Sequence, residues 1–167
     1  MAPPNLWYFD DDGRTPNNVW PVIVHRVTLD ANDPAAGLER LLADNDWPPQ
    51  WRGGVFDYHH FHSNAHEALA VATGRAELIL GGEHGETVTV SAGDIVILPA
   101  GTGHCCMSAS ADFCLVAGYP SDQQNWDLCR TGQADIDAAR ARIRATTRPA
   151  QDPVTGGRDG LLTHWPI

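Results

Sequence analysis

The chain has 167 residues, 43% of them hydrophobic and 19% charged, a length that suits one domain with a substantial core. Its net charge of −10 argues against a nucleic-acid backbone or an anionic membrane as a partner, because either would require clustered positive charge. All 11 basic residues are arginine, so Schiff-base lysine chemistry, a pyridoxal-phosphate lysine and a P-loop lysine are excluded.

The first predicted elements are a strand and a helix. Residues 19–29 are mostly apolar and β-branched, which predicts a buried strand. A helix is predicted over 34–43, with Asn32 or Asp33 as N-cap and Pro34 at its first position. Its apolar stripe consists of Leu38, Leu41 and Leu42.

The middle of the chain is predicted to be an antiparallel β-domain. Short apolar or alternating runs follow one another between glycine turns: FDYHHFH, ALAVAT, RAELILG, ETVTV, DIVILP and DFCLVAGY. Because no helix separates these strands, they favour a sandwich, barrel or jelly roll over a βαβ sheet. We therefore predict an all-β fold class and a single domain over 1–167, with a barrel core at about 19–120.

A helix and a tail are predicted at the C-terminal end, over about 133–167. The segment QADIDAARARIRA places Ile136, Ala139 and Ile143 on one helical face, and its arginine-rich opposite face is expected to be solvated. The tail contains Pro and Gly and is expected to wrap around the domain.

The cellular location is predicted to be the cytoplasm. The N-terminal stretch has neither a basic leader nor an apolar signal region, and no run reaches the roughly 20 apolar residues of a membrane span. The cysteines at 105, 106, 114 and 129 form no C-x-x-C motif, so we expect reduced thiols rather than a zinc ribbon or a disulfide framework.

Four of the eight histidines lie within residues 54–74, which suggests a metal site. His60 and His62 are two residues apart in a strand-like run and project from one face, whereas His59 faces the other way. Glu67 can join the pair if the polar residues 63–65 form a turn, and its neighbour His66 then points away.

A further candidate ligand comes from a distant strand. The segment GDIVILPAGTGH predicts a strand and a turn that end in His104. Three imidazoles and one carboxylate suit Fe, Mn, Ni, Cu or Zn and would leave open positions in an octahedral site. The alternative is that these histidines are surface or hydrogen-bonded core residues.

The two histidine segments resemble the two motifs of the cupin superfamily. Residues 54–74 read G-x5-H-x-H-x4-E-x6-G, and residues 93–104 read G-x5-P-x-G-x2-H. The second motif departs from the usual pattern at Ser108, where asparagine is common. The segments NNVWPVIVHRVTL, DFCLVAGYP, NWDLC and DPVTGGRDGLLTHW extend the likeness to small single-domain bacterial cupins of the YjlB type.

This resemblance implies a fold, a cofactor and a range of activities. It implies a double-stranded β-helix or jelly-roll barrel with a few short flanking helices, and one divalent transition metal ion held by His60, His62, Glu67 and His104. It also implies a small-molecule substrate and a homodimer. The leading hypothesis is a metal-dependent enzyme of dioxygenase, decarboxylase or isomerase type, although Glu67 counts against a thiol dioxygenase. The alternative is a non-catalytic, metal-dependent binding or sensing module.

Several side chains near the motifs are weaker candidates. Tyr58 shares the inward parity of His60 and is a candidate proton donor or a lining residue. Cys106 shares the parity of His104 and is a candidate thiol ligand or an inert buried thiol. Arg52 is a candidate carboxylate binder at the barrel mouth or a plain surface residue.

The remaining histidines and the tryptophans are given mainly structural interpretations. His25, His84 and His164 belong to no cluster and are expected at the surface. The six tryptophans, including Trp47, Trp51 and Trp126, could line a pocket for a flat organic ligand, but core or dimer contacts are commoner.

Overall fold

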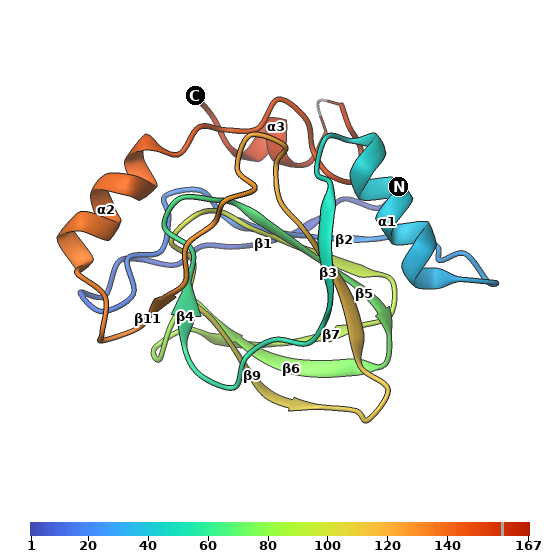
Figure 1. Ribbon diagram of the computed structural model, residues 1–167, viewed down its shortest axis with the longest axis horizontal. Coiled ribbons are helices and arrows are strands. Elements are labelled where there is room, and N and C mark those ends of the chain that lie inside the picture. Colours follow the sequence, from blue (N-terminus) through green and yellow to red (C-terminus); the bar gives the residue numbers. More distant parts are fainter. Residues whose placement is uncertain (158) are drawn as a thin grey trace.

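The protein consists of two antiparallel sheets that face each other, with three helices outside them, in a computed structural model that describes residues 1–157 and 159–167 (Figure 1). Arg158, within the quoted DPVTGGRDGLLTHW stretch, lies outside the described residues. The six-stranded sheet has the order β1-β2-β8-β5-β10-β3 and the five-stranded sheet the order β11-β4-β9-β6-β7. This architecture confirms the prediction of an all-β fold.

The strand bounds follow the alternating runs of the sequence. The six-stranded sheet contains β1 (Asn5–Trp7), β2 (Val22–Arg26), β3 (Pro49–Gly53), β5 (Glu67–Thr73), β8 (Asp94–Leu98) and β10 (Cys114–Gly118). The five-stranded sheet contains β4 (His60–Phe61), β6 (Arg75–Leu80), β7 (Glu86–Ser91), β9 (His104–Ala109) and β11 (Cys129–Arg130).

The six-stranded sheet is apolar on both faces because each face covers a different core. Along β5, Leu69 and Val71 belong to the cluster between the sheets, and Ala68, Ala70 and Ala72 belong to the cluster on the outer face. The outer cluster includes side chains from helices α1 and α3, which lie over this sheet in Figure 1. A strand that is buried on both faces reads as a continuous apolar run, as ALAVAT does.

Helix α1 (Pro34–Asp44) forms where its capping residues predict it. Asp33 is the N-cap and accepts a hydrogen bond from the backbone N–H of Ala36 at 3.0 Å. Leu38 and Leu42 are buried in the outer cluster, and Leu41 packs against it. Helix α2 (Ile136–Ala145) begins after its N-cap Asp135 and buries Ala139 against Phe61 and Cys129.

Several elements were not predicted. Strands β1, β3 and β11 and the short helix α3 (Leu161–His164) carry little periodicity of their own, and neighbouring chain segments determine them. The predicted strand over 19–29 is shorter, since only Val22–Arg26 pairs in the sheet. None of the described helices is long and apolar enough to cross a membrane.

The C-terminal tail binds the outer face through a buried pair, which makes the surface prediction for His25 wrong. His25 lies on β2 with 2% of its surface exposed, and its Nε2 is 3.2 Å from Oδ2 of Asp152. Asp152 is fully buried and accepts the backbone N–H groups of Val154, Thr155 and Leu161. A lone histidine in an apolar strand needs such a partner when a later segment covers it.

Two motif glycines sit where a side chain would not fit. Gly74 has a φ of +72°, and an added Cβ would lie 2.8 Å from the backbone of Phe113. Gly101 has a φ of +92°, and an added Cβ would lie 2.4 Å from the carbonyl oxygen of Asn17. Both positions need the left-handed backbone and the close approach that only glycine supplies without strain.

Candidate metal centre

The four predicted ligand residues meet in the interior between the two sheets. His60 on β4 pairs directly with His104 on β9, so their rings are neighbours, with centroids 4.1 Å apart. His62 follows β4, and Glu67 is the first residue of β5 in the opposite sheet. All four side chains are buried, with at most 6% of the residue surface exposed.

Backbone carbonyls orient all three imidazoles in the same sense. Nδ1 of His60 donates to the carbonyl oxygen of Tyr58 at 2.9 Å, and Nδ1 of His104 donates to that of Thr102 at 3.0 Å. Nδ1 of His62 donates to the carbonyl oxygen of Asp127. Since a carbonyl can only accept, Nδ1 carries a proton in each ring, and Nε2 is the nitrogen whose lone pair can bind a metal when the imidazole is neutral.

Glu67 faces these lone pairs with one oxygen that has no hydrogen-bond donor. Its Oε1 accepts the phenol of Tyr119 at 2.6 Å. Its Oε2 is buried and lacks a hydrogen-bond partner, although it lies 3.3 Å from Nε2 of His62 and 3.2 Å from Nε2 of His104. A buried carboxylate oxygen beside these nitrogens needs a positive charge among them, supplied either by a metal cation or by a proton on one Nε2.

The pKa values of the buried groups at this site are shifted by burial and by one another's charges. Burial by itself would raise the pKa of Glu67, but the adjacent His62 and His104 hold the pKa of that carboxyl well below its usual range. Burial opposes protonation of His62 as well, yet the Glu67 carboxylate raises the pKa of His62. Burial, aided by His104, lowers the pKa of His60 to about 3. Burial and the Glu67 charge raise the pKa of Tyr119, so its phenol stays protonated.

The donor set fits a transition metal ion. His60, His62 and His104 could hold a metal, since their ligand atoms all lie within 4.8 Å of one another. Imidazole nitrogens with one carboxylate suit Fe, Mn, Ni, Cu or Zn. A divalent cation among them would satisfy the unpartnered Oε2 and the Nε2 lone pairs together.

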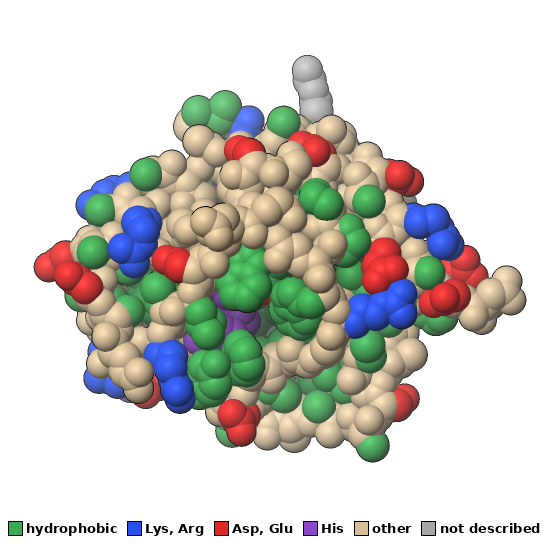
Figure 2. Space-filling model, viewed as in Figure 1, with side chains coloured by type: hydrophobic (Ala, Val, Ile, Leu, Met, Phe, Trp, Pro, Cys, Tyr) green, Lys and Arg blue, Asp and Glu red, His purple; other side chains and the backbone are tan. Residues whose placement is uncertain are grey.

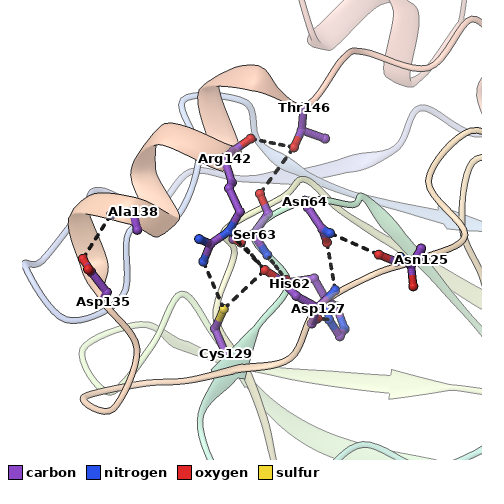
Figure 3. A network of polar contacts seen from close by, with 10 residues as sticks. All are labelled: His62, Ser63, Asn64, Asn125, Asp127, Cys129, Asp135, Ala138, Arg142 and Thr146. Carbon is purple, nitrogen blue, oxygen red and sulfur yellow. Dashed lines mark hydrogen bonds and ion pairs between the residues drawn. The ribbon is translucent and has the colours of Figure 1, made fainter.

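A network of polar contacts holds His62 in place (Figure 3). The Asp127 carboxylate accepts the backbone N–H of Ser63 at 2.6 Å and the Ser63 hydroxyl. Arg142 of α2 donates to Ser63 Oγ at 2.6 Å and lies 3.3 Å from Asp127 Oδ2. The arginine-rich face of α2 was expected to be solvated. Arg142 on this helix instead contacts Ser63, the residue that follows the candidate ligand His62.

Removing the Asp127 carboxylate is expected to weaken metal binding without abolishing it. In Asp127→Ala, the loop that supplies the carbonyl acceptor of His62 loses its attachment to Ser63, and we expect metal affinity to fall about 10- to 100-fold. Asp127→Asn keeps an acceptor oxygen and should restore part of the affinity. Chelator competition measures the Kd, and Asp122→Ala, at an exposed position, is the control. An unchanged Kd in Asp127→Ala would show that the loop holds its place without this carboxylate.

A cavity of about 340 Å³ opens beside the candidate ligands. Its lining includes all four of them, together with Trp51, Gly53, Gly54, Val55, Phe56, Leu69, Tyr119 and Trp126. Figure 2 shows histidine side chains at the bottom of a hollow whose rim is mostly hydrophobic. A larger groove of about 740 Å³ lies between the N-terminal segment and α2, and none of the four residues lines it.

None of the three weaker candidates is among the described lining residues of this cavity. The Tyr58 ring stacks on Phe56 and lies under the Arg130 guanidinium, 3.9 Å from its Cζ, and is not among the lining residues of the described chain. Cys106 packs against the interior core, also outside that lining, and burial raises the pKa of its thiol. Arg52 forms a bidentate ion pair with Glu39, at 2.6 and 2.8 Å.

His66, which was predicted to point away from the candidate ligands, has different surroundings. His66 is fully buried against Trp20 and Trp165, which stack on each other; its Nδ1 accepts the N–H of Ala100, and its Nε2 donates to the carbonyl of Thr147. The burial lowers the pKa of His66 to about 4. This tautomer is the reverse of that in the three clustered histidines, which is what a structural histidine on the opposite face requires.

Two functional residues escaped the sequence reasoning. Tyr119 binds the Glu67 carboxylate, and Asp127 orients His62 through its carbonyl oxygen. The position of Tyr119, at the end of an apolar run with a buried polar tip, is a signal that could have indicated it. Asp127 lies in an irregular segment and leaves no periodic signal.

The fold and the site define a small double-stranded β-helix protein in which three histidines could hold a metal ion. Residues 50–116 match the family model of the cupin domain. The chain is 38% identical over 161 residues to the "Uncharacterized protein YjlB" of Bacillus subtilis (strain 168), which covers 95% of this chain and 94% of that protein. The chain therefore belongs to the cupin family.

The comparison with solved structures found matches that share little sequence with the chain. A DUF861 family protein from Thermotoga maritima is 18% identical, with 59% of this chain and 98% of that chain covered and a TM-score of 0.38. A conserved protein with a double-stranded β-helix domain from Klebsiella pneumoniae is 16% identical, with coverages of 78% and 82% and a TM-score of 0.38.

Proposed function

We propose that this cupin binds one divalent transition metal ion through His60, His62, Glu67 and His104 and acts as a metal-dependent enzyme on a small organic molecule. The observation that carries the proposal is a cluster of three imidazoles beside a cavity, two of which place Nε2 3.2 and 3.3 Å from a buried Glu67 oxygen that has no hydrogen-bond partner. A metal held there would polarise the oxygen atoms of a bound molecule or activate dioxygen, which suits a dioxygenase, a decarboxylase or an isomerase.

The residues of the chain would each have a defined task. The carbonyls of Tyr58, Thr102 and Asp127 keep the protons on Nδ1, so that Nε2 stays available as a ligand. Tyr119 holds Glu67 by donating to Oε1, which directs Oε2 toward the histidines. Trp51 in turn donates to the Tyr119 oxygen at 3.0 Å and fixes the phenol.

Elemental analysis of protein purified without chelator or nickel resin tests the metal. We expect close to one Fe, Mn, Ni, Cu or Zn per chain, and its identity then selects which reactions to assay. If the purified protein contains no metal and takes none up on reconstitution, the proposal loses its basis.

A non-catalytic binding or sensing module is the second candidate, and the cavity wall favours it in one respect. The one hydroxyl among the described lining residues is that of Tyr119, which is already committed to Glu67. The wall thus offers no side-chain acid or base apart from the candidate ligands. A metal-loaded protein that binds a small molecule reversibly and returns it unchanged, with and without dioxygen, would favour this candidate.

The same proposal covers organisation and location. The packing of α1 and α3 on the barrel supports one domain over 1–167. The four cysteines are free thiols, which suits a cytoplasmic protein.

We expect a homodimer, supported by exposed apolar side chains such as Tyr8 and Val19. Light scattering should give about twice 18.1 kDa, and a species of 18.1 kDa alone would contradict it.

A further inference from the structure

We propose that the cavity selects a flat, aromatic molecule whose only polar attachment is an oxygen donor to the metal, and that it rejects molecules with a second charged group. This inference rests on the proposed metal site and adds the chemical class of the ligand. Three features of the described lining residues support it. Most of their side chains are aromatic or aliphatic, the polar atoms of the aromatic residues are already hydrogen-bonded within the protein, and no arginine or lysine is among them.

Apart from the candidate ligands, the side chains that line the cavity are aromatic and aliphatic. Tyr119 and Trp126 stack on each other with centroids 5.2 Å apart, and Trp126 lies edge-on to His62 at 4.9 Å. Phe56 lies edge-on to His60 at 5.3 Å, with 51% of its surface exposed. Aromatic rings therefore adjoin two of the candidate ligands, and a flat ring bound at the metal would contact them.

The polar tips of these aromatic residues are bound within the protein. The Trp51 indole donates to Tyr119, the Tyr119 phenol donates to Glu67, and the Trp126 indole donates to Oε1 of Gln50 at 2.9 Å. The rings thus offer apolar faces and edges to a ligand rather than hydrogen bonds. The side-chain atoms left for polar contact are the three Nε2 atoms and Oε2 of Glu67, which the metal would occupy.

No arginine stands among the lining residues in 1–157 and 159–167, and the chain has no lysine. Arginines near the cavity have other contacts: Arg52 pairs with Glu39, Arg130 lies over the Tyr58 ring, and Arg142 donates to Ser63. A carboxylate or phosphate at the far end of a ligand would be buried without a counter-charge, which is strongly unfavourable. The volume of about 340 Å³ lies at the small end of ligand pockets and suits one or two rings.

Matched hydroxamates test the inference, because they chelate a metal through the same two oxygen atoms and differ only in the attached group. We would load the protein with Zn²⁺ and measure Kd by calorimetry for acetohydroxamate, benzohydroxamate and succinohydroxamate. The phenyl compound is expected to bind at least about 10-fold tighter than the methyl compound, because a ring is buried in place of a methyl group. The compound with the anionic tail should bind no tighter than the methyl compound.

Variants connect the preference to the wall. Phe56→Ala should reduce the phenyl preference several-fold, because it removes one aromatic ring from the cavity wall. The control is Met107→Ala, which truncates another exposed apolar side chain, 59% exposed, outside the described cavity lining. The inference would be overturned if the phenyl and methyl compounds had equal Kd values on Zn²⁺-loaded protein, or if the anionic compound bound tightest. Either result would leave the proposed metal site standing. Failure to bind Zn²⁺ would overturn the proposed function and the inference with it.

Discussion

His104→Ala is expected to lose its bound metal, with affinity reduced by more than about 100-fold. Residues that only orient a metal ligand typically account for 10- to 100-fold, so the loss of a ligand should exceed that range. His104 supplies one of the three convergent Nε2 atoms, and its ring lies 4.1 Å from that of His60. Elemental analysis and chelator competition measure the loss, and His60→Ala, His62→Ala and Glu67→Ala should behave alike.

The matched control is His84→Ala, which removes an exposed imidazole between β6 and β7. Its metal content should equal that of the wild type. Added metal should raise the Tm of the wild type and of His84→Ala, since a ligand that binds only the folded state stabilises it, but not that of His104→Ala. Glu67→Gln retains an oxygen for Tyr119 and loses the charge, so an intermediate affinity is expected. Equal metal content in all these variants would refute the ligand assignment.

Asp152→Ala should reduce the free energy of unfolding by about 3–5 kcal/mol, because it removes one partner of a buried pair and leaves several buried donors without an acceptor. The carboxylate accepts three backbone N–H groups at 2.7 to 2.9 Å and lies 3.2 Å from Nε2 of His25, with no exposed side-chain surface. Its removal leaves all four groups without their acceptor beneath the C-terminal tail. Urea unfolding monitored by circular dichroism measures the change.

Asp44→Ala is the control for this variant, because Asp44 is an exposed carboxylate at the end of α1 and should change stability by less than about 0.5 kcal/mol. Asp152→Asn keeps one acceptor oxygen and should fall between Asp152→Ala and the wild type. A loss below about 1 kcal/mol in Asp152→Ala would show that the tail folds over β2 without this pair.

The same carboxylate makes a pH-dependent contribution. Burial would raise the pKa of Asp152, but His25 and the backbone N–H donors hold it below its usual range. A group whose folded pKa is depressed stabilises the protein above its unfolded pKa of about 3.9, and this stabilisation is lost as pH falls through the folded pKa. The stability difference between the wild type and Asp152→Asn should therefore narrow as the solution is acidified below about pH 4.

Local chemistry explains which elements could be predicted. The capping of α1 by Asp33 and Pro34 and its leucine stripe are contained within a dozen residues, and the helix expected over 34–43 spans Pro34–Asp44. The six short runs between the glycine turns likewise appear as β4, β5, β6, β7, β8 and β10. The spacing of His60, His62, Glu67 and His104 allowed them to be grouped before their geometry was known, because strand parity and turns determine which side chains share a face.

Long-range contacts decided the rest. Tyr119 meets Glu67 across 52 residues, Arg142 meets Ser63 across 79, and Asp152 meets His25 across 127. Nothing in the neighbourhood of His25 distinguishes a surface imidazole from a buried one, since its burial depends on the tail that covers β2. The sequence by itself determined the β-rich class and helix α1, because those depend on near neighbours, and it grouped the candidate ligands through the spacing within two separate motifs. Only the tertiary structure decided the tautomers, the unpartnered Glu67 oxygen and the aromatic wall, because they depend on which distant segments pack together.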